Sequence, residues 1–365
     1  MKAIKATAIV LASLIGLIAL AFVILRVVYP GILRAKHKIS APGIDAMEIA
    51  EIGGIQQAMY FRGKDIDNPV ILVLHGGPGL PMNMLLHAYQ YDWETDFTVV
   101  NWDQRLAGRT LLLNSLEIVE TMSMECMLAD AREVTQYIKQ KLNKDKIIVM
   151  GFSWGAVLGT TLVQTYPEDY SAYIGVGQIV EGKEGERARY EKALEQARAA
   201  GNRGDIAALE AFAPFALPED YDESIDMLMG VGPYLSKYLP SGVSIPRLMA
   251  GVVSTTPYYK LSELLRFLSD DVFNQYPIPI SRYIYETYDA RSLGAEYEMP
   301  VYYIMGVNDW QTPYPVAKAF FAEISAPDKS FFSIPGAGHW AMLDNKAEFS
   351  RVLLEEIRPR IDSHG

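Results

Sequence analysis

Short runs of consecutive apolar residues recur along this chain and limit the folds that it can adopt. Five runs are interpreted as strands, at residues 69–74, 97–102, 146–150, 299–305 and 330–334. Continuous apolar character is typical of strands that are buried on both faces, as in a parallel sheet. Helical patterns lie between the runs, for example at 123–142, where Ser123 is a plausible N-cap. The alternation predicts an α/β fold with a mostly parallel sheet and helices on both faces.

Two parts of the chain depart from this alternation. Residues 46–52 and 55–61 are β-prone and are joined at Gly53-Gly54, which predicts an antiparallel hairpin. From about residue 180 to 295 the chain is mostly helix-like. A helical insertion between two strands of one sheet predicts a lid over the carboxyl ends of the strands, where ligands of α/β proteins bind.

The first segment of the chain is different in kind. Residues 6–25 carry no charge and consist mainly of Ile, Leu, Val, Ala and Phe. About twenty residues in a helix match a hydrocarbon core roughly 30 Å thick. A cleaved signal peptide is the alternative, but the stretch is longer than the usual core of such a signal and no small-x-small site closes it. We expect a retained single-pass anchor in the lipid bilayer. Basic residues on both flanks leave the side of the membrane open.

These features divide the chain into four segments. At 365 residues it is long for one compact domain, but one α/β core with an inserted lid accommodates this length. The predicted segments are a membrane anchor with its juxtamembrane residues (1–40), the first part of the core (41–179), the helical lid (180–295) and the second part of the core (296–365).

Charge and cysteine content exclude several classes of function. The net charge of −11 argues against a nucleic-acid partner, because phosphate binding needs a basic face. Cys126 is the only cysteine, which excludes an intramolecular disulfide framework and a thiolate zinc cluster. Its place in the first turn of a predicted helix indicates a small buried apolar residue. No metal or organic cofactor is expected, because no His, Asp and Glu cluster has ligand spacing.

The sequence GFSWG at residues 151–155 is the strongest local signal for chemistry. It directly follows the predicted strand at 146–150 and precedes an apolar stretch. Glycines on either side of a serine permit a sharp strand-to-helix turn, which raises the hydroxyl above the sheet edge at a helix N-terminus. The bare pattern is common by chance, but a strand before it and a helix after it predict that Ser153 is a nucleophile.

A serine hydroxyl is a weak nucleophile and needs a base. Of the five histidines, His339 alone lies in a loop after a strand late in the chain, and the α/β-hydrolase order of serine, acid and histidine selects it. The acid should follow a strand between the two, as Asp309 does, and would orient the imidazole. A turn aspartate that caps the next helix is the alternative role for Asp309. Asp328 and Asp344 are the nearest rivals.

The glycine-rich sequence HGGPG at 75–79 follows the first buried strand. It can direct a backbone N–H into the site, and we expect the N–H groups of Gly77 and Trp154 to form an oxyanion hole. The alternative is an ordinary glycine turn. His75 is expected to make structural hydrogen bonds within the loop.

Together these motifs resemble one known family, the proline iminopeptidases, a peptidase branch of the α/β-hydrolases. The motifs that carry the resemblance are HGGPG (75–79), NWDQRLAGRT (101–110), GFSWG (151–155), the loop of Asp309 and GAGHW (336–340). The similarity runs from about residue 45 to the C-terminus. It implies the triad and the oxyanion donors named above, and it makes residues 103–105 a loop that supports the site.

The chain also departs from this family. Leu106 follows Arg105, where family members usually place a glycine. Proline iminopeptidases hold the free amino terminus of the substrate with lid carboxylates. Here Glu181, Glu184 and Glu186 open the predicted lid, but acids beside Lys and Arg on a helix also suit a solvated charged face. The substrate-binding residues therefore stay unassigned.

We expect a serine hydrolase that acts through an acyl-enzyme. The resemblance implies an aminopeptidase that releases N-terminal proline, or another residue, from short peptides. A membrane-associated carboxylesterase or lactonase acting on an apolar acyl substrate is the alternative, because of the anchor and the Tyr-, Leu- and Met-rich lid. A binding protein without catalysis on the same fold is the third hypothesis.

Overall fold

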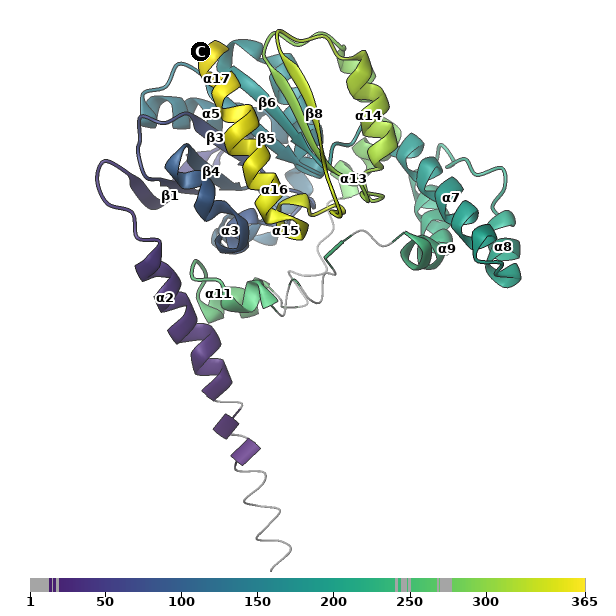
Figure 1. The fold of residues 1–365 in the computed structure, drawn as a ribbon, viewed down its shortest axis with the longest axis horizontal. Helices are drawn as coiled ribbons and strands as arrows, with labels where there is room; N and C mark the ends of the chain where they lie inside the picture. Colours follow the sequence, from purple (N-terminus) through teal and green to yellow (C-terminus); the bar gives the residue numbers. More distant parts are fainter. Residues whose placement is uncertain are drawn as a thin grey trace, which may run out of the picture.

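A computed structural model describes residues 13, 14, 16, 17, 20–239, 242, 243, 248, 251–267, 269 and 278–364. An eight-stranded sheet forms its centre, with helices on both faces (Figure 1). The strands are β1 (Ile44–Ile52), β2 (Ile55–Gly63), β3 (Val70–Leu74), β4 (Thr98–Asp103), β5 (Ile147–Phe152), β6 (Tyr170–Val176), β7 (Val301–Gly306) and β8 (Lys329–Ile334). Their order across the sheet is β1-β2-β4-β3-β5-β6-β7-β8.

The pairing of the strands confirms the predicted architecture. β1 and β2 form an antiparallel hairpin in which Ile52 pairs with Ile55. Gly53 and Gly54 both have positive φ, as a two-residue hairpin turn requires. β2 also pairs antiparallel with β4, whereas every pair from β4 to β8 is parallel. The carboxyl ends of the parallel strands therefore meet at one edge of the sheet.

The strand β6 was not predicted from the sequence, and the list of five buried runs was wrong in this respect. This strand, Tyr170–Val176, lies between β5 and β7 and is almost entirely buried. It contains Ser171 and Gly175 among aromatic residues, so it does not have the continuous aliphatic character of its neighbours. Gly175 is required by packing, since a side chain there would meet the Gln178 amide and the ring of Tyr303.

Helices cover both faces of the sheet, and alternate residues of each strand face opposite layers. In β3, Leu72 packs into one hydrophobic cluster and Ile71 into the other. The first cluster is shared with α5, α6 and α14, and the second with α3, α16 and α17. The bounds of these helices are α3 (Leu86–Tyr89), α5 (Met124–Leu142), α6 (Trp154–Thr165), α14 (Tyr314–Glu323), α16 (Lys346–Arg351) and α17 (Arg358–His364).

The helix α5 begins as predicted, but its cysteine is less buried than expected. The hydroxyl of Ser123 accepts a hydrogen bond from the N–H of Cys126 at 3.2 Å, which confirms Ser123 as the N-cap. Cys126 is only half-buried. Met124 and Met127 occupy the core-facing positions of this turn, so Cys126 lies at the margin of the buried face.

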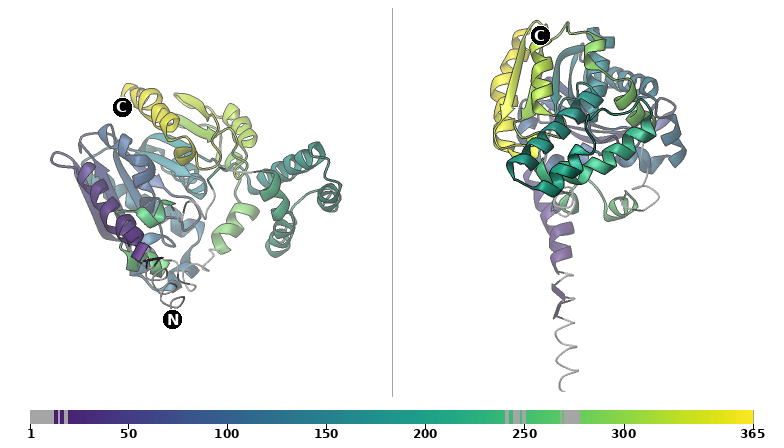
Figure 2. Two further views of the ribbon diagram at one scale, coloured as in Figure 1. Left: turned by 60° about the horizontal axis from the view of Figure 1, so that its bottom comes forward. Right: turned by 90° about the vertical axis from the view of Figure 1, so that its right-hand side faces the viewer.

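The insertion between β6 and β7 is helical, as predicted. Its helices are α7 (Gly182–Ala199), α8 (Arg203–Glu210), α9 (Tyr221–Tyr238), α11 (Leu261–Phe267) and α13 (Ile278–Glu286). The first three share a hydrophobic cluster of their own and project sideways from the sheet (Figures 1 and 2). That the insertion acts as a lid remains a prediction.

Short helices complete the described chain. They are the π-helices η1 (Ile24–Val28) and η8 (Val352–Ile357), the α-helices α2 (Tyr29–Lys36), α4 (Gly108–Leu113) and α15 (Ala341–Asp344), and the 3-10 helices η2 (Met82–Met84), η3 (Gln90–Thr95), η4 (Leu116–Thr121), η5 (Pro167–Asp169), η6 (Val253–Thr255) and η7 (Ala290–Leu293).

The predicted anchor lies largely outside the described residues. Residues 6–12, 15, 18 and 19 of the predicted span 6–25 are not described. Within the part of the chain that is described, no helix has both the length and the apolar character needed to cross a bilayer. The anchor therefore stays a prediction.

A buried ion pair connects the loop after β4 to α5. Arg105 Nε lies 2.6 Å from Asp130 Oδ2, and the two side chains are 4% and 1% exposed. The same guanidinium donates to the carbonyl of Gly53, and the Gln57 amide donates to Asp130. This cluster fixes the end of the 103–105 loop against the hairpin.

We predict that Arg105→Met lowers the free energy of unfolding by about 3–5 kcal/mol, because it leaves the Asp130 carboxylate buried without its partner. Chemical denaturation of the full chain measures this change. Arg132→Met is the matched control, since Arg132 is 45% exposed and lies 3.7 Å from Glu168, and we expect a change below about 1 kcal/mol there. Equal effects of the two substitutions would contradict the prediction.

Candidate active site

Ser153 lies in a strained turn between β5 and α6. Its φ of 56° and ψ of −118° are unusual for a residue with a side chain. The turn is held because the N–H of Ser153 donates to the carbonyl of Val176, at the end of β6, at 2.9 Å. The residue is 7% exposed. The sequence motif therefore forms the predicted strand-turn-helix unit.

The glycines on either side of this serine are required by close packing. A Cβ on Gly155 would overlap the carbonyl oxygen of Leu74, because α6 passes directly over the end of β3. A Cβ on Gly151 would overlap the backbone of Gly155. Both contacts are with backbone atoms, which cannot move aside, so the pattern of residues follows from the geometry of the turn.

Asp309 and His339 come together at the same edge of the sheet. The Nδ1 atom of His339 lies 3.0 Å from Asp309 Oδ2, and both side chains are 1% exposed. Asp309 Oδ1 accepts hydrogen bonds from the N–H groups of Gln311 and Thr312. The hydroxyl of Thr312 donates to Asp309 Oδ2 at 2.8 Å and lies 3.3 Å from His339 Nδ1. The carboxylate is thus held by the turn that follows it.

The rival acids have other partners. Asp344 accepts from the N–H groups of Gly338 and Val243, and burial raises its pKa. Asp328 lies at the start of β8, away from the carboxyl edge, and accepts from the hydroxyl of Tyr302. Of the three candidate acids, Asp309 is the one whose carboxylate contacts the imidazole of His339.

Ser153 and His339 both adjoin Phe152, whose ring centroid lies 5.0 Å from that of the histidine. Among the described residues, the hydrogen bonds of the His339 ring go to Asp309 and Thr312. The structure therefore brings the three predicted residues together at one edge of the sheet. The contact between Asp309 and His339 is formed. Among the described residues, the Ser153 hydroxyl makes no hydrogen bond to the His339 imidazole.

The loop at 75–79 runs beside the serine. A Cβ on Gly76 would lie 3.1 Å from Ser153 Cβ. Gly77 has a φ of +113°, and a side chain there would meet the N–H of Gly79 at 2.7 Å, so only glycine fits. Trp154 is the first residue of α6, where backbone N–H groups lack a partner within the helix. Both predicted oxyanion donors thus belong to segments that border Ser153.

His75 has the structural role that the sequence predicts. It is 1% exposed, and burial lowers its pKa to about 4, although the Gly76 carbonyl acts in the opposite direction. Its Nδ1–H donates to that carbonyl at 2.8 Å, and its Nε2 accepts from the N–H of Gln104 at 3.2 Å. The ring is therefore neutral and joins the two loops.

Gln104 and Thr312 are site residues that were not singled out individually from the sequence. Gln104 Oε1 accepts from the indole N–H of Trp154 at 2.9 Å, so it positions the residue after the nucleophile. The NWDQR motif placed it in a supporting loop, but a contact 50 residues away along the chain is not visible in a sequence. Thr312 follows Asp309 by three residues, the spacing of a turn hydrogen bond, and this was the available signal.

The acids that open the insertion all have partners. Glu181 caps α7 through the N–H groups of Lys183 and Glu184, and Glu184 pairs with Arg291 at 2.9 Å. Glu186 pairs with Arg189 at 2.7 Å.

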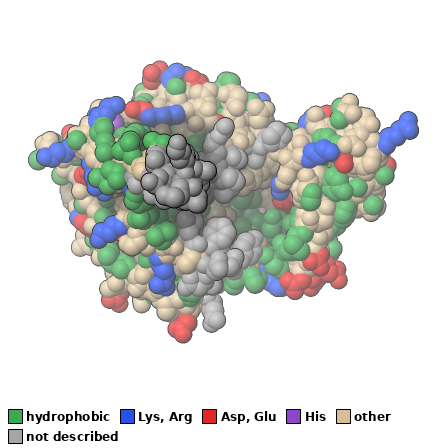
Figure 3. Space-filling model, turned by 90° about the horizontal axis from the view of Figure 1, so that it is seen from below, with side chains coloured by type: hydrophobic (Ala, Val, Ile, Leu, Met, Phe, Trp, Pro, Cys, Tyr) green, Lys and Arg blue, Asp and Glu red, His purple; other side chains and the backbone are tan. Residues whose placement is uncertain are grey.

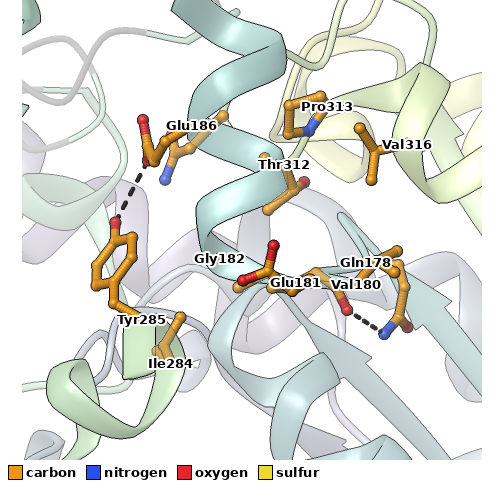
Figure 4. A pocket seen from close by; sticks show the side chains of 13 residues that line it. Gln178, Val180, Glu181, Gly182, Glu186, Ile284, Tyr285, Thr312, Pro313 and Val316 are labelled. Carbon is orange, nitrogen blue, oxygen red and sulfur yellow. Dashed lines mark hydrogen bonds between the residues drawn. The ribbon is translucent and has the colours of Figure 1, made fainter. Parts of the chain in front are cut away.

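A cavity of about 60 Å³ is lined by Glu181, Glu186 and Thr312, among other residues. Figure 4 shows Glu181 at the start of α7 and Glu186 farther along this helix, where the Tyr285 hydroxyl donates to Glu186 at 3.3 Å. Thr312 joins this cavity to the Asp309–His339 pair. Within the described chain, no group of three or more His, Cys, Asp or Glu side chains is arranged to hold a metal ion.

Comparison with known proteins identifies a family. The family described as the alpha/beta hydrolase fold matches residues 69–346. The chain is 25% identical to the probable aminopeptidase YbaC of Bacillus subtilis (strain 168) over 322 residues, which cover 86% of this chain and 97% of that protein.

Solved structures give the same fold. A proline iminopeptidase-related protein of Thermus thermophilus has a TM-score of 0.58 at 20% identity, covering 88% of this chain and 99% of its own. The proline iminopeptidase of Mycobacterium smegmatis has a TM-score of 0.59 at 17% identity, covering 87% of this chain and 98% of its own. The α/β-hydrolase fold that the resemblance implies is thereby confirmed.

The buried neutral His75 predicts a specific loss of stability in acid. The unfolded chain binds this proton near the ordinary pKa of about 6.5, whereas the folded chain binds it only near pH 4. Unfolding therefore takes up a proton between these values, and stability falls as the pH falls, by about 1.4 kcal/mol per pH unit for one group.

His75→Gln should remove the contribution of His75 to the change of the free energy of unfolding with pH between pH 6.5 and 4. Denaturation at several pH values measures this change. Burial also lowers the pKa of His87 to about 4, so His87 contributes to the pH dependence of stability in both the wild type and the variant. Above pH 7.5 the two curves should run parallel. An unchanged slope in the variant would show that His75 is not the group responsible.

Proposed function

Because the chain belongs to the alpha/beta hydrolase fold family, we propose that it is a serine hydrolase with Ser153 as nucleophile, His339 as base and Asp309 as the acid that orients it. The observation that carries this proposal is the buried 3.0 Å contact between Asp309 and His339, beside the strained turn of Ser153. Strain of this kind is concentrated at functional sites.

The proposed reaction begins when Ser153 Oγ attacks the carbonyl carbon of the substrate. His339 takes the hydroxyl proton on Nε2, since its Nδ1 faces Asp309. The tetrahedral intermediate collapses when the leaving group accepts that proton from His339, which leaves an acyl-serine. Water then attacks the acyl-enzyme with His339 as base, and the acid is released.

The negative oxygen of the tetrahedral intermediate needs fixed donors. We assign this role to the backbone N–H groups of Gly77 and Trp154, because the 75–79 loop and the start of α6 both border Ser153. Each donor of this kind lowers the barrier by roughly 3–4 kcal/mol. Gln104 and His75 support the two segments from behind.

For the substrate we favour a short peptide with a free amino terminus, so that the enzyme is an aminopeptidase that releases proline or another N-terminal residue. The relative named a probable aminopeptidase supports this class. The cavity beside Thr312 adds support, because Glu181 and Glu186 line it. Their present partners are helix N–H groups and Arg189, so a substrate amine would have to compete with them.

An esterase or lactonase acting on an apolar acyl substrate is the second candidate, and the position of the N-terminal helix favours it. We propose that residues 6–25 anchor the enzyme in a bilayer. In Figure 1, β8 ends on the side of the sheet where α15 lies. The helix α2 extends from the molecule on this same side. The carboxyl edge of the sheet, which carries the proposed triad, would then face the membrane.

The nucleophile is tested by labelling the full chain in detergent with a fluorophosphonate. We expect one label per chain, and complete loss of label in Ser153→Ala. Asp309→Asn should slow labelling by roughly three orders of magnitude, because the imidazole loses its orienting carboxylate. Ser333→Ala, whose hydroxyl contacts Tyr314, is the control and should label normally. An unlabelled wild-type protein would refute the serine hydrolase proposal.

The substrate class is tested by comparing proline β-naphthylamide with p-nitrophenyl esters of short fatty acids. Turnover of the amide, lost in Ser153→Ala, is expected for an aminopeptidase. An N-acetylated proline amide is the matched control, because it lacks the free amine and should not be cleaved. Turnover of the esters alone would reject the peptidase and favour the second candidate.

A further inference from the structure

A second cavity lies beside the N-terminal helix, apart from the catalytic residues. It is an open cavity of about 640 Å³, lined by α2, the β1–β2 hairpin, Arg109 and the segment at Pro257 and Tyr258. Four cationic side chains line it, those of Arg34, Lys38, Arg62 and Arg109. Asp45 is the acidic residue among the lining side chains.

The cations of the core already have acidic partners, whereas those of the N-terminal segment do not. Arg62 contacts Glu94 at 2.7 Å and Asp45 at 2.6 Å, and Arg109 contacts Glu263 at 2.8 Å. By contrast, Arg34 and Lys38 form no ion pair with any residue that the structure describes. Two positive charges therefore remain available on the helix side of the cavity.

The end of the N-terminal helix presents these charges to the cavity. Gly31, Arg34 and Ala35 of α2 line it, and their spacing of three and four residues places them on one face of the helix. Lys38, two residues beyond the end of α2, also lines the cavity. Gly31 and Ala35 are small, which leaves room beside Arg34 for a group about the size of a phosphate. Lys36 is on the same helix but does not line the cavity.

Hydrogen bonds fix the helix against the core. Arg26 donates to the carbonyls of Ser254, Thr256 and Tyr259 at 2.8–3.3 Å, and Arg34 donates to the carbonyl of Pro257. The cavity is therefore bounded by parts of the chain that hold each other in place, and its shape does not depend on an isolated helix.

Exposed apolar side chains on the N-terminal helical segment and on α11 indicate the source of the anion. Val28 and Ile32 on the N-terminal helix are 46% and 56% exposed, and Leu265 on α11 is 60% exposed. Hydrophobic side chains and Lys and Arg side chains gather on this face (Figure 3). In water such exposure is unfavourable, but it suits the boundary between lipid head groups and acyl chains.

We propose that this cavity binds the phosphodiester head group of an anionic phospholipid, with Arg34 and Lys38 as the principal contacts. The proposal rests on the anchor proposed above, because the anchor brings the cavity to the bilayer surface. Clusters of Lys and Arg beside a membrane segment attract anionic lipids. Bound there, the lipid would orient the catalytic edge toward the membrane.

The test uses the full chain in a nonionic detergent and dihexanoyl phosphatidylglycerol below its micelle concentration, with affinity measured by calorimetry at fixed ionic strength. We expect saturable binding of one lipid, weaker binding of dihexanoyl phosphatidylcholine, and much weaker binding of inorganic phosphate. Lys38→Gln should weaken phosphatidylglycerol binding about fivefold, and Arg34→Gln with Lys38→Gln about 25-fold. Lys36→Gln, the matched control, should change it less than twofold.

Each other outcome overturns the proposal. Equal affinity for the two lipids would exclude a charge-selective site. Inorganic phosphate that binds as tightly as phosphatidylglycerol would assign the cavity to a soluble anion. Equal losses in the Lys36 and Lys38 variants would place the binding elsewhere. Lys38→Gln keeps the test valid if the Arg34 variant fails to fold, because Lys38 lacks an ion pair in the described structure.

Whether residues 6–25 anchor the chain in a bilayer is tested separately, by carbonate extraction of the full chain from vesicles. A chain that carbonate releases, but that still binds the short lipid, would refute the anchor and leave the head-group site standing. A chain that stays in the vesicles, but does not distinguish the two lipids, would refute the site and leave the anchor.

Discussion

The packing of α6 against the end of the sheet is the constraint on which the proposed active site depends. The helix passes so close to β3 that Gly155 lies against the carbonyl of Leu74, and the N–H of Ser153 is bonded to the end of β6. Three strands thus fix one backbone turn. A serine in that turn has no freedom to relax its positive φ, because any relaxation would separate α6 from the strands beneath it.

Buried polar contacts between residues far apart in the sequence also hold the loops around Ser153 in place. His75 and Gln104 join the loops after β3 and β4, and Gln104 then holds the indole of Trp154. Arg105, the next residue, is fixed by Asp130 in the buried ion pair with α5. The loops after β3 and β4 and the start of α6 are therefore tied to one another by buried polar side chains, and the burial makes such hydrogen bonds costly to break.

The sequence predicted the parts of this arrangement that depend on local pattern. Buried strands, the Gly53-Gly54 hairpin and the turn at Ser153 are encoded by neighbouring residues, and the order of Asp309 and His339 followed from the strands before them. It did not reveal β6, whose Gly175 is explained only by the neighbours that pack on it. Nor did it reveal Gln104 as the partner of Trp154, because that contact exists only once three strands are side by side.

The N-terminal helix is part of the packing of the catalytic domain. Arg26 binds three carbonyls of residues 254–259, and the hydroxyl of Tyr259 in this segment bonds to Asn83 and Asp103 at 2.7 and 3.0 Å.

Asp103 ends β4, and Asn83 follows the 75–79 loop that borders Ser153. The contact of Arg26 with Tyr259 and that of Tyr259 with Asn83 therefore connect the helix to this part of the chain. Burial raises the pKa of Asp103, and Tyr259 is one of the groups that stabilise its charged form. A chain shortened to remove the helix would leave the carbonyls at 254, 256 and 259 without their donor. Removal of the helix would therefore disturb contacts that lead toward the 75–79 loop, which is why the experiments above use the full chain.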